Sequence, residues 1–269
     1  EQHRQKITNL IEEYHIGGLI FFQGGPARQI DLTNFYQSKS KVPLMIGIDA
    51  EWGLKMRLDS TFKFPKQMTL GAMQEDTLVY QMGMEIANHC KRIGVHVNFA
   101  PVLDVNNNPN NPVINYRSFG ENRENVSRKG IQYLRGLQNN GVLANGKHFP
   151  GHGDTDQDSH KSLPTVPHNR ARLDSVELFP FQNAIQQDIG SIMVAHLRVP
   201  KLESTTDLAT TLSPKVVTQL LKEEMGFEGL IFTDALNMKG VSAYYKPGEV
   251  DVKALLAGND VLLFSEDVP

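Results

Sequence analysis

The feature that most constrains the fold is an alternation of short apolar runs with helical stretches along the chain. Apolar runs of strand length lie at residues 18–22, 42–49, 95–101, 142–149, 191–197, 229–234 and 260–264. The spacing of apolar residues predicts helices at 1–15, 75–92, 122–139, 171–187, 214–225 and 250–257. This order predicts a parallel sheet with helices between its strands. It argues against a β-sandwich, whose strands follow one another without helices.

Seven parallel strands fit either an open doubly wound sheet or an eight-stranded α/β barrel short of one strand. We predict a (β/α)8 barrel whose first strand and last helix lie outside the chain, because the chain begins with a helix and stops just after a strand. No second core, linker or low-complexity segment interrupts the pattern. Residues 1–269 are therefore expected to form one domain, a barrel truncated at both ends.

The positions of polar residues favour the barrel over the open sheet. Residues able to bind or react stand at or just past the ends of expected strands: Asp49, Asp104, Lys147, His148, His196 and Asp234. The longer connections follow these same ends, whereas the opposite connections, such as 92–95 and 226–229, are short. Barrel enzymes carry their chemistry at the carboxyl ends of the strands. This face is the expected site.

Composition limits the classes of partner. The 269 residues carry a formal net charge of −3 with no basic stripe, which argues against a nucleic-acid partner. No apolar run reaches the roughly 18 residues of a membrane span. Cys90 is the single cysteine, so an intrachain disulfide and a thiolate metal cluster are excluded, while the compartment stays open.

The stretch KHFPGHGDTDQDSHKSLP, residues 147–164, gathers side chains that can move protons. Asp158 and His160 lie two positions apart and would face the same side of an extended loop. A carboxylate bonded to one ring nitrogen fixes the tautomer of the imidazole and raises its pKa, so the pair can act as a proton donor near neutral pH. Gly151 and Gly153 would be hinges, and we expect this loop to be less ordered than the barrel.

Asp234 ends the apolar run of GLIFTDALNMKG, and its carboxylate is expected to project into the mouth of the barrel. A partly buried carboxylate near cations is a good nucleophile toward an electrophilic carbon. The alternative reading is a helix N-cap, which Asp also serves well.

A mixture of cationic donors and an acidic acceptor is expected around the same mouth: Asp49, Arg57, Arg117, Lys147 and His148. Sugar hydroxyls require such a mixture in fixed places. The two arginines can equally be solvated, or paired with Glu51 and Glu121. Trp52, the single tryptophan, would stack on a sugar ring or cap the core.

Five motifs in one order, IDAEWG, FAPVLDV, RSFGE, KHFPGHGDTDQDSHKSLP and FTDALNMKG, resemble glycoside hydrolase family 3, in its branch of β-N-acetylhexosaminidases. The resemblance covers about residues 18–264. It implies a (β/α)8 barrel and retaining hydrolysis of terminal β-linked N-acetylglucosamine, with a carbohydrate substrate and neither metal nor organic cofactor. Other members continue into further domains, so an additional C-terminal domain outside this chain is possible.

The resemblance also implies roles for individual residues. Asp234 matches the nucleophile of the family, and His160 matches its acid/base, with Asp158 as the partner of the histidine. Asp49, Arg57, Arg117, Lys147 and His148 match the sugar-binding positions. The chain departs from the family where Trp52 replaces a frequent glycine and where Ala235 replaces an Asp found in some members. Trp52 bears on the preference for the aglycone.

Three alternatives stay open from the sequence. A metal-dependent hydrolase would use His148, His152, His160 and an Asp as ligands, although barrel metallohydrolases usually take ligands from several strands. A non-catalytic sugar-binding module should have lost Asp234 or His160, and both are present. A glycoside phosphorylase is a closer variant, because a neutral histidine tolerates incoming phosphate better than a carboxylate does.

Overall fold

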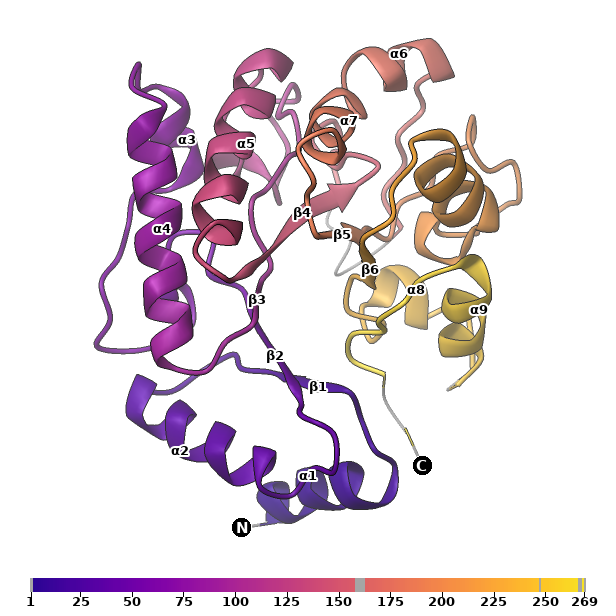
Figure 1. The fold of residues 1–269 in the computed structure, drawn as a ribbon. Coiled ribbons are helices and arrows are strands. Elements are labelled where there is room, and N and C mark those ends of the chain that lie inside the picture. The colour runs from indigo at the N-terminus through magenta and orange to yellow at the C-terminus, as the bar shows by residue number, and fades with distance from the viewer. Residues whose placement is uncertain (1, 158–162, 247, 266–267, 269) are drawn as a thin grey trace.

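The computed structural model describes residues 2–157, 163–246, 248–265 and 268. Its centre is one parallel sheet whose strands follow the order of the chain (Figure 1). The strands are β1 (Gly18–Ile20), β2 (Met45–Ile48), β3 (Val97–Asn98), β4 (Leu143–Phe149), β5 (Ser191–Val194) and β6 (Leu230–Thr233). Each strand pairs with the next one in parallel. All carboxyl ends therefore meet at one face.

Helices lie outside the curled sheet (Figure 1). The α-helices are α1 (Gln2–Glu13), α2 (Pro26–Gln37), α3 (Gln67–Gly71), α4 (Thr77–Arg92), α5 (Arg123–Gln138), α6 (Arg170–Ser175), α7 (Phe179–Ile185), α8 (Lys239–Ser242) and α9 (Glu249–Ala257). Short 3-10 turns are η1 (Leu54–Met56), η2 (Asn115–Arg117) and η3 (Thr210–Leu212), and η4 (Lys215–Glu224) is a π-helix. No helix in the described part of the chain is long and apolar enough to span a bilayer.

The curl of the sheet brings its two edges together. On one edge, Val261 makes a parallel bridge with Phe232 of β6. Farther along, the ring of Phe264 lies 5.1 Å from that of Phe22, just past β1 on the other edge. Inside the curl, a small buried cluster joins side chains from β3, β5 and β6: Val97, Phe99, Met193 and Phe232. The predicted barrel architecture is confirmed.

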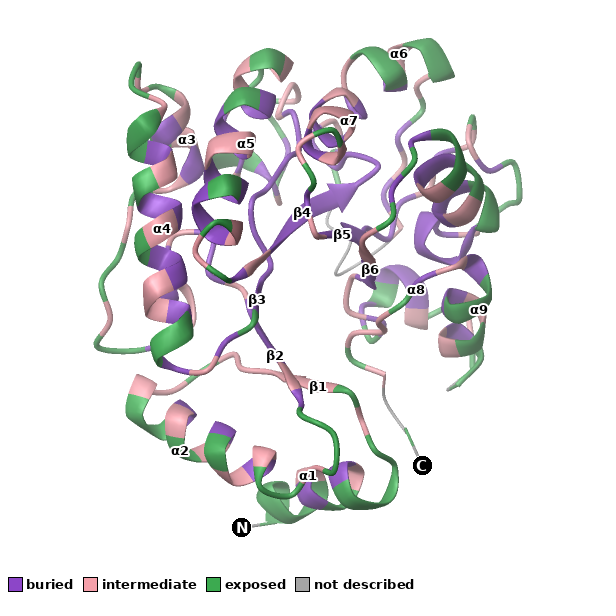
Figure 2. Cartoon of the chain, in the orientation of Figure 1, coloured by how far each residue is buried: buried purple, intermediate pink, exposed green. Residues whose placement is uncertain are grey.

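The outer core lies between the sheet and the helices that cover it, whose buried positions face inward in Figure 2. Helices α4 and α5 approach each other closely at Gly83 and Gly136. A Cβ at Gly136 would lie 2.4 Å from the backbone oxygen of Tyr80. The two glycines thus set the distance between α4 and α5. This distance in turn fixes the position of α5.

Several elements differ from the sequence prediction. The seventh strand, expected at 260–264, is a single bridge at Val261 in the described chain. The helix expected at 171–187 is divided into α6 and α7, because Pro180 lacks the amide hydrogen that a continuous helix would need. Residues 176–178 form the break, and this break places Glu177 in the interior. The short α8 had no prediction.

Candidate functional site

Lys147 stands at the centre of the polar network on the carboxyl face of the sheet. Its side chain is 3% exposed, and its Nζ lies 2.8 Å from Oδ1 of Asp49 and 2.9 Å from Oε1 of Glu51. Asp49 follows β2 directly, and its other oxygen accepts from Nη2 of Arg57 at 2.5 Å. One cation from β4 therefore binds two carboxylates that follow β2. A second cation, Arg57, binds the remaining oxygen of Asp49.

Arg117, which ends η2, extends this network across the face. Its Nη2 lies 2.7 Å from Oε1 of the fully buried Glu51, and its Nε lies 3.1 Å from Oε2 of the same carboxylate. The pair is bidentate, the arrangement that fixes both partners most firmly. Nη2 of Arg117 also lies 3.2 Å from Nε2 of His148. Because a guanidinium only donates, Nε2 of His148 is an acceptor.

Asp104 orders the start of the histidine-rich loop. Its Oδ2 lies 2.7 Å from Nδ1 of His148, which must carry the ring proton because Nε2 accepts. The same carboxylate accepts the backbone amides of His148 at 3.1 Å and of His152 at 2.6 Å. The ring of His148 is thus fixed in orientation, and the chain from 148 to 152 is tied to one buried carboxylate.

Asp234 lies directly after β6, and its Oδ1 accepts from the backbone amide of Ala235 at 2.8 Å. Beside it, His196 follows β5. Nε2 of His196 donates to the carbonyl of Ala235 at 2.9 Å, and Nδ1 lies 2.7 Å from Oγ1 of Thr211. Two strand ends therefore present an imidazole and a carboxylate next to each other.

The carboxylates of the site are held ionised. Burial alone would raise the pKa of Glu51, but the charges of Arg117 and Lys147 outweigh it and leave the pKa well below its usual range. Burial would also raise the pKa of Asp49, but the charges of Lys147 and Arg57 outweigh it and lower this pKa. For Asp234, the effect of burial is overcome by His196 and His148, and its pKa also falls. Asp234 is an anion at neutral pH.

Burial has the opposite consequence for His152, which is almost fully inaccessible. Loss of solvent lowers its pKa to about 4, although the charge of Asp104 acts in the other direction. Its Nδ1 lies 2.7 Å from Oγ1 of Thr155. His152 is therefore neutral at physiological pH.

The structure brings together the five sugar-binding residues expected from the sequence: Asp49, Arg57, Arg117, Lys147 and His148. Lys147 and His148 also act electrostatically on Asp234, so the carboxylate belongs to the same face. Arg117 pairs with Glu51 inside the network, while Arg57 pairs with Asp49. Asp158 and His160 lie outside the described residues.

Other expectations at the site turn out differently. Asp234 does not cap α8, whose N-cap position is Met238. Gly153 is a point of close packing: a Cβ there would lie 1.9 Å from the carbonyl oxygen of Val105. Gly151 has a φ of +131°, a region that favours glycine, and a Cβ there would lie 2.8 Å from Cβ of Glu177. Both glycines hold the start of the loop against its neighbours.

Sequence reasoning placed Asp104 and His196 on the site face without a specific role, considered Glu51 only as a partner of an arginine, and missed Tyr133 entirely. Asp104 and His196 carried a signal, since both follow expected strands. Tyr133 carried none: it lies in α5, and its hydroxyl donates to the carbonyls of Ala50 and Glu51, each at 3.1 Å. It supports the backbone that presents the network from behind.

A metal centre at the two described histidines of this loop is poorly matched to their bonds. Both ring nitrogens of His148 already have partners, Asp104 and Arg117. His152 has its Nδ1 against Thr155. What the arrangement offers is a set of fixed donors, acceptors and one flanked carboxylate, which suits a hydroxyl-rich ligand.

Comparison with known proteins gives a consistent result. The chain matches the family described as Glycosyl hydrolase family 3 N terminal domain over residues 1–269. It is 38% identical to a curated β-hexosaminidase A from Pseudoalteromonas piscicida, over 96% of this chain and 47% of the relative. The chain therefore spans about half the length of that relative.

Two solved structures are similar in fold. A glycoside hydrolase family 3 β-N-acetylglucosaminidase from Paenibacillus sp. str. FPU-7 superposes with a TM-score of 0.91 at 43% identity, covering 96% of this chain and 50% of that one. A β-glucoside phosphorylase superposes with a TM-score of 0.90 at 25% identity, covering 94% of this chain and 47% of that one. Both reach well beyond the barrel described here.

Proposed function

Because this chain belongs to the glycosyl hydrolase family 3 N-terminal domain family, we propose that it forms the catalytic barrel of a retaining glycoside hydrolase. Its substrate would be a glycan ending in β-linked N-acetylglucosamine. The proposal gives Asp234 the role of nucleophile and His160, partnered by Asp158, that of acid/base. The similarity to a named β-hexosaminidase and to a β-N-acetylglucosaminidase supports this choice of sugar.

The single observation that carries the proposal is the setting of Asp234. The carboxylate lies at the carboxyl end of β6 with its pKa lowered against burial by His196, His148 and Lys147. An anion held in this way can attack a carbon without first losing a proton. Nearby, Asp49 with Arg57 and Lys147 offers donors and an acceptor in fixed positions for hydroxyls of the terminal sugar.

The reaction would run in two displacements. Asp234 attacks the anomeric carbon, the bond from that carbon to the aglycone oxygen breaks, and protonated His160 gives its proton to the leaving oxygen. In the second step His160 removes a proton from water, whose oxygen attacks the same carbon and releases Asp234. Two inversions retain the configuration. Asp158 would hold the histidine ring in the tautomer that both steps need.

The test is hydrolysis of a chromogenic β-N-acetylglucosaminide beside the matching β-glucoside, in the intact protein and with a chelator present. We expect turnover of the N-acetyl substrate alone, unaffected by the chelator. Asp234→Asn should lower kcat by at least about a thousandfold, on the scale of losing a covalent nucleophile. Asp59→Asn, which replaces an exposed aspartate that also follows β2, is the matched control and should stay active.

His160 is tested separately, with a substrate whose leaving group needs protonation. His160→Ala should lose most activity on an unactivated glycoside and far less on one with an acidic phenol as leaving group, because general acid catalysis matters only for the first. A variant that kept full activity on the unactivated glycoside would remove His160 from the mechanism.

A phosphorylase is the second candidate, and the fold similarity to a β-glucoside phosphorylase favours keeping it. Phosphate would replace water in the second step and leave a sugar 1-phosphate. Turnover measured with and without phosphate, with product identified by mass, separates the two. If a sugar phosphate is the main product, the reaction is phosphorolysis and not hydrolysis. Asp234 would keep its role as nucleophile in either case.

A further inference from the structure

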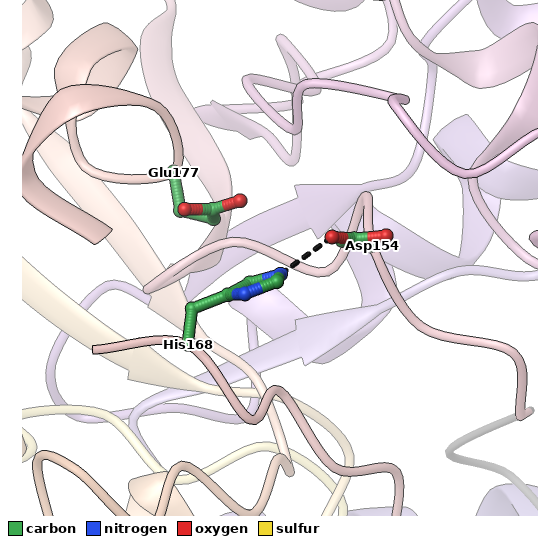
Figure 3. A group of neighbouring side chains, drawn as sticks. All are labelled: Asp154, His168 and Glu177. Atoms are coloured by element: carbon green, nitrogen blue, oxygen red, sulfur yellow. Dashed lines mark hydrogen bonds and ion pairs between the residues drawn. The ribbon is translucent and has the colours of Figure 1, made fainter. Parts of the chain in front are cut away.

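A second group of ligating side chains lies where the loop after β4 meets the segment around α6. Asp154 belongs to the loop, His168 to the segment before α6, and Glu177 to the break between α6 and α7. Figure 3 shows the three side chains gathered around one point. None of them takes part in the network around Lys147.

The geometry of these three residues suits a metal ion better than it suits an ordinary ion pair. One imidazole nitrogen and one oxygen from each carboxylate lie within 4.8 Å of one another. Ligands of one tetrahedral zinc ion lie about 3.4 Å apart, given bonds of roughly 2.0–2.2 Å. The widest separation would therefore close by at most about 1.4 Å, and the 2.5 Å pair of His168 and Asp154 would open by about 0.9 Å, both within reach of side-chain rotation.

Glu177 supplies an independent observation. The residue is 2% exposed, yet among the described residues its Oε2 has no hydrogen-bond partner. A buried carboxylate oxygen without a partner is costly and calls for a cation. The base of this side chain packs closely, since a Cβ on Gly151 would lie 2.8 Å from Cβ of Glu177. The unpaired oxygen thus belongs to a residue that the surrounding packing keeps in the interior.

The other two ligands are reachable from solvent. The side chains of Asp154 and His168 are 24% and 25% exposed, and Nε2 of His168 lies 2.5 Å from Oδ2 of Asp154. A divalent ion would take the place of the proton between these two atoms. Binding through one histidine and two carboxylates is a set that zinc and similar transition metals accept.

Arg172 is the cation that contacts the two carboxylates of this group. Its Nη2 lies 3.1 Å from Oε1 of Glu177 and 3.7 Å from Oδ2 of Asp154. The side chain of Arg172 is 35% exposed although its Nε is buried, so the guanidinium has a path outward when a stronger cation arrives. Arg172 therefore competes with a metal for the same carboxylates and sets the affinity.

We propose that Asp154, His168 and Glu177 bind one divalent transition-metal ion, with Arg172 as the competing internal cation. Asp154 and His168 are 14 positions apart, on either side of residues 155–167, so the ion would join both ends of that segment. The site is structural and does not depend on the chemistry proposed for Asp234.

The test is calorimetric titration of Zn²⁺ into the metal-free intact protein. We expect one site with a dissociation constant in the micromolar range or below. Asp154→Asn, His168→Ala and Glu177→Gln should each weaken binding at least tenfold, whereas Arg172→Gln should bind more tightly; unchanged affinity in Arg172→Gln would remove Arg172 as the competing cation. The controls are His3→Ala, an exposed histidine distant in the chain, and Asp174→Asn, an exposed carboxylate of α6 that is not one of the three ligands.

Thermal unfolding and limited proteolysis give a second test, which also shows whether each variant is folded. Zn²⁺ should raise the thermal midpoint of the wild type and slow proteolytic cutting within residues 155–167, and both effects should vanish in Asp154→Asn and His168→Ala. Zinc binding of equal strength in these variants, or none in the wild type, would overturn the proposal. Tighter zinc binding by Arg172→Gln would establish the competition. None of these results depends on glycosidase activity.

Discussion

At the scale of single residues, the site is organised by buried charges that neutralise one another. Lys147 contacts Asp49 and Glu51 while only 3% of its side chain is exposed. Such a network is favourable only as a whole, because removing one member leaves a charge in a medium that cannot solvate it. The residues that bind the sugar in our proposal are therefore also residues on which the fold depends.

Lys147→Met tests this dependence. The variant keeps the aliphatic stem but leaves Asp49 and Glu51 without their shared cation, so we expect the free energy of unfolding to fall by about 3–5 kcal/mol. Denaturant unfolding measures it. Lys39→Met, which removes a 3.8 Å surface pair with Glu12, is the control and should cost less than about 1 kcal/mol. Similar losses in the two variants would contradict the buried network.

The pH dependence of stability has a contribution from His152. Its pKa in the folded chain is about 4, against an ordinary value of 6.5. Between these values the unfolded chain binds a proton that the folded chain does not, so the free energy of unfolding falls as the pH drops from about 6.5 toward 4. The loss reaches at most about 3 kcal/mol.

His152→Asn removes that titration while keeping a polar atom near the position of Nδ1. We expect the variant to be less stable at pH 7 but to lose less stability on acidification to pH 5 than the wild type does. Urea unfolding at a series of pH values compares the two slopes. Parallel curves would mean that His152 is not the group that responds.

The residues themselves could be found in the sequence, but their partners could not. The rule that chemistry follows parallel strands located Asp49, Lys147, His148 and Asp234. That Arg117 would bind Glu51 depends on a separation of 66 positions bridged by the register of the sheet. Tyr133 supports the site from a helix, where an aromatic residue at helical spacing indicates only a core position.

At the scale of elements, the helix pair α4 and α5 shows how small residues set the geometry. Gly83 and Gly136 allow the two backbones to touch, with 2.4 Å between a hypothetical Cβ at Gly136 and the oxygen of Tyr80. This contact positions α5, whose Tyr133 holds the backbone at Ala50 and Glu51. The close contact between α4 and α5 therefore affects the position of the backbone at the site.

Gly136→Ala should be destabilising for this reason. A methyl group there meets backbone atoms that cannot rotate away, and overpacking of this kind costs about 1–3 kcal/mol despite the better helix propensity of alanine. Gly130→Ala in the same helix is the matched comparison, because its Cβ would meet the flexible side chain of Leu103. Thermal unfolding should show the larger loss for Gly136→Ala.

Element boundaries were the part of the fold that sequence patterns predicted least well. The helices α4, α5 and α9 lie within two residues of their predicted limits. Patterning failed at 171–187 because apolar spacing continued through Pro180, where a backbone hydrogen bond is lost. It failed at 260–264 because an apolar run indicates burial and does not indicate how many ladder hydrogen bonds form.

At the scale of the whole molecule, the curled sheet is closed by contacts beyond its strands. The rings of Phe22 and Phe264 lie 5.1 Å apart, and the guanidinium of Arg57 lies 4.7 Å from the ring of Phe22. Arg57 in turn binds Asp49. The closure at the sheet edges is thus continuous with the proposed sugar-binding network.

A double-mutant cycle measures that closure. We expect Phe22→Ala and Phe264→Ala to show a coupling of about 0.5–1.5 kcal/mol in the free energy of unfolding, the usual range for an aromatic pair. Phe22→Ala paired with Phe62→Ala, an exposed aromatic residue elsewhere, should be additive. A coupling near zero for the first pair would mean that the ring contact does not hold the edges together.

The balance of charge within the site has a consequence for how a ligand arrives. The cations Arg57, Arg117 and Lys147 are in direct contact with the carboxylates of Asp49 and Glu51. Asp104 and Asp234 are held by neighbouring histidines and backbone amides. Fields from such closely paired charges cancel within a short distance, so little potential extends into the surrounding water. An uncharged sugar would be neither drawn in nor repelled from afar. Its rate of encounter should then be indifferent to ionic strength, and recognition would begin only at contact.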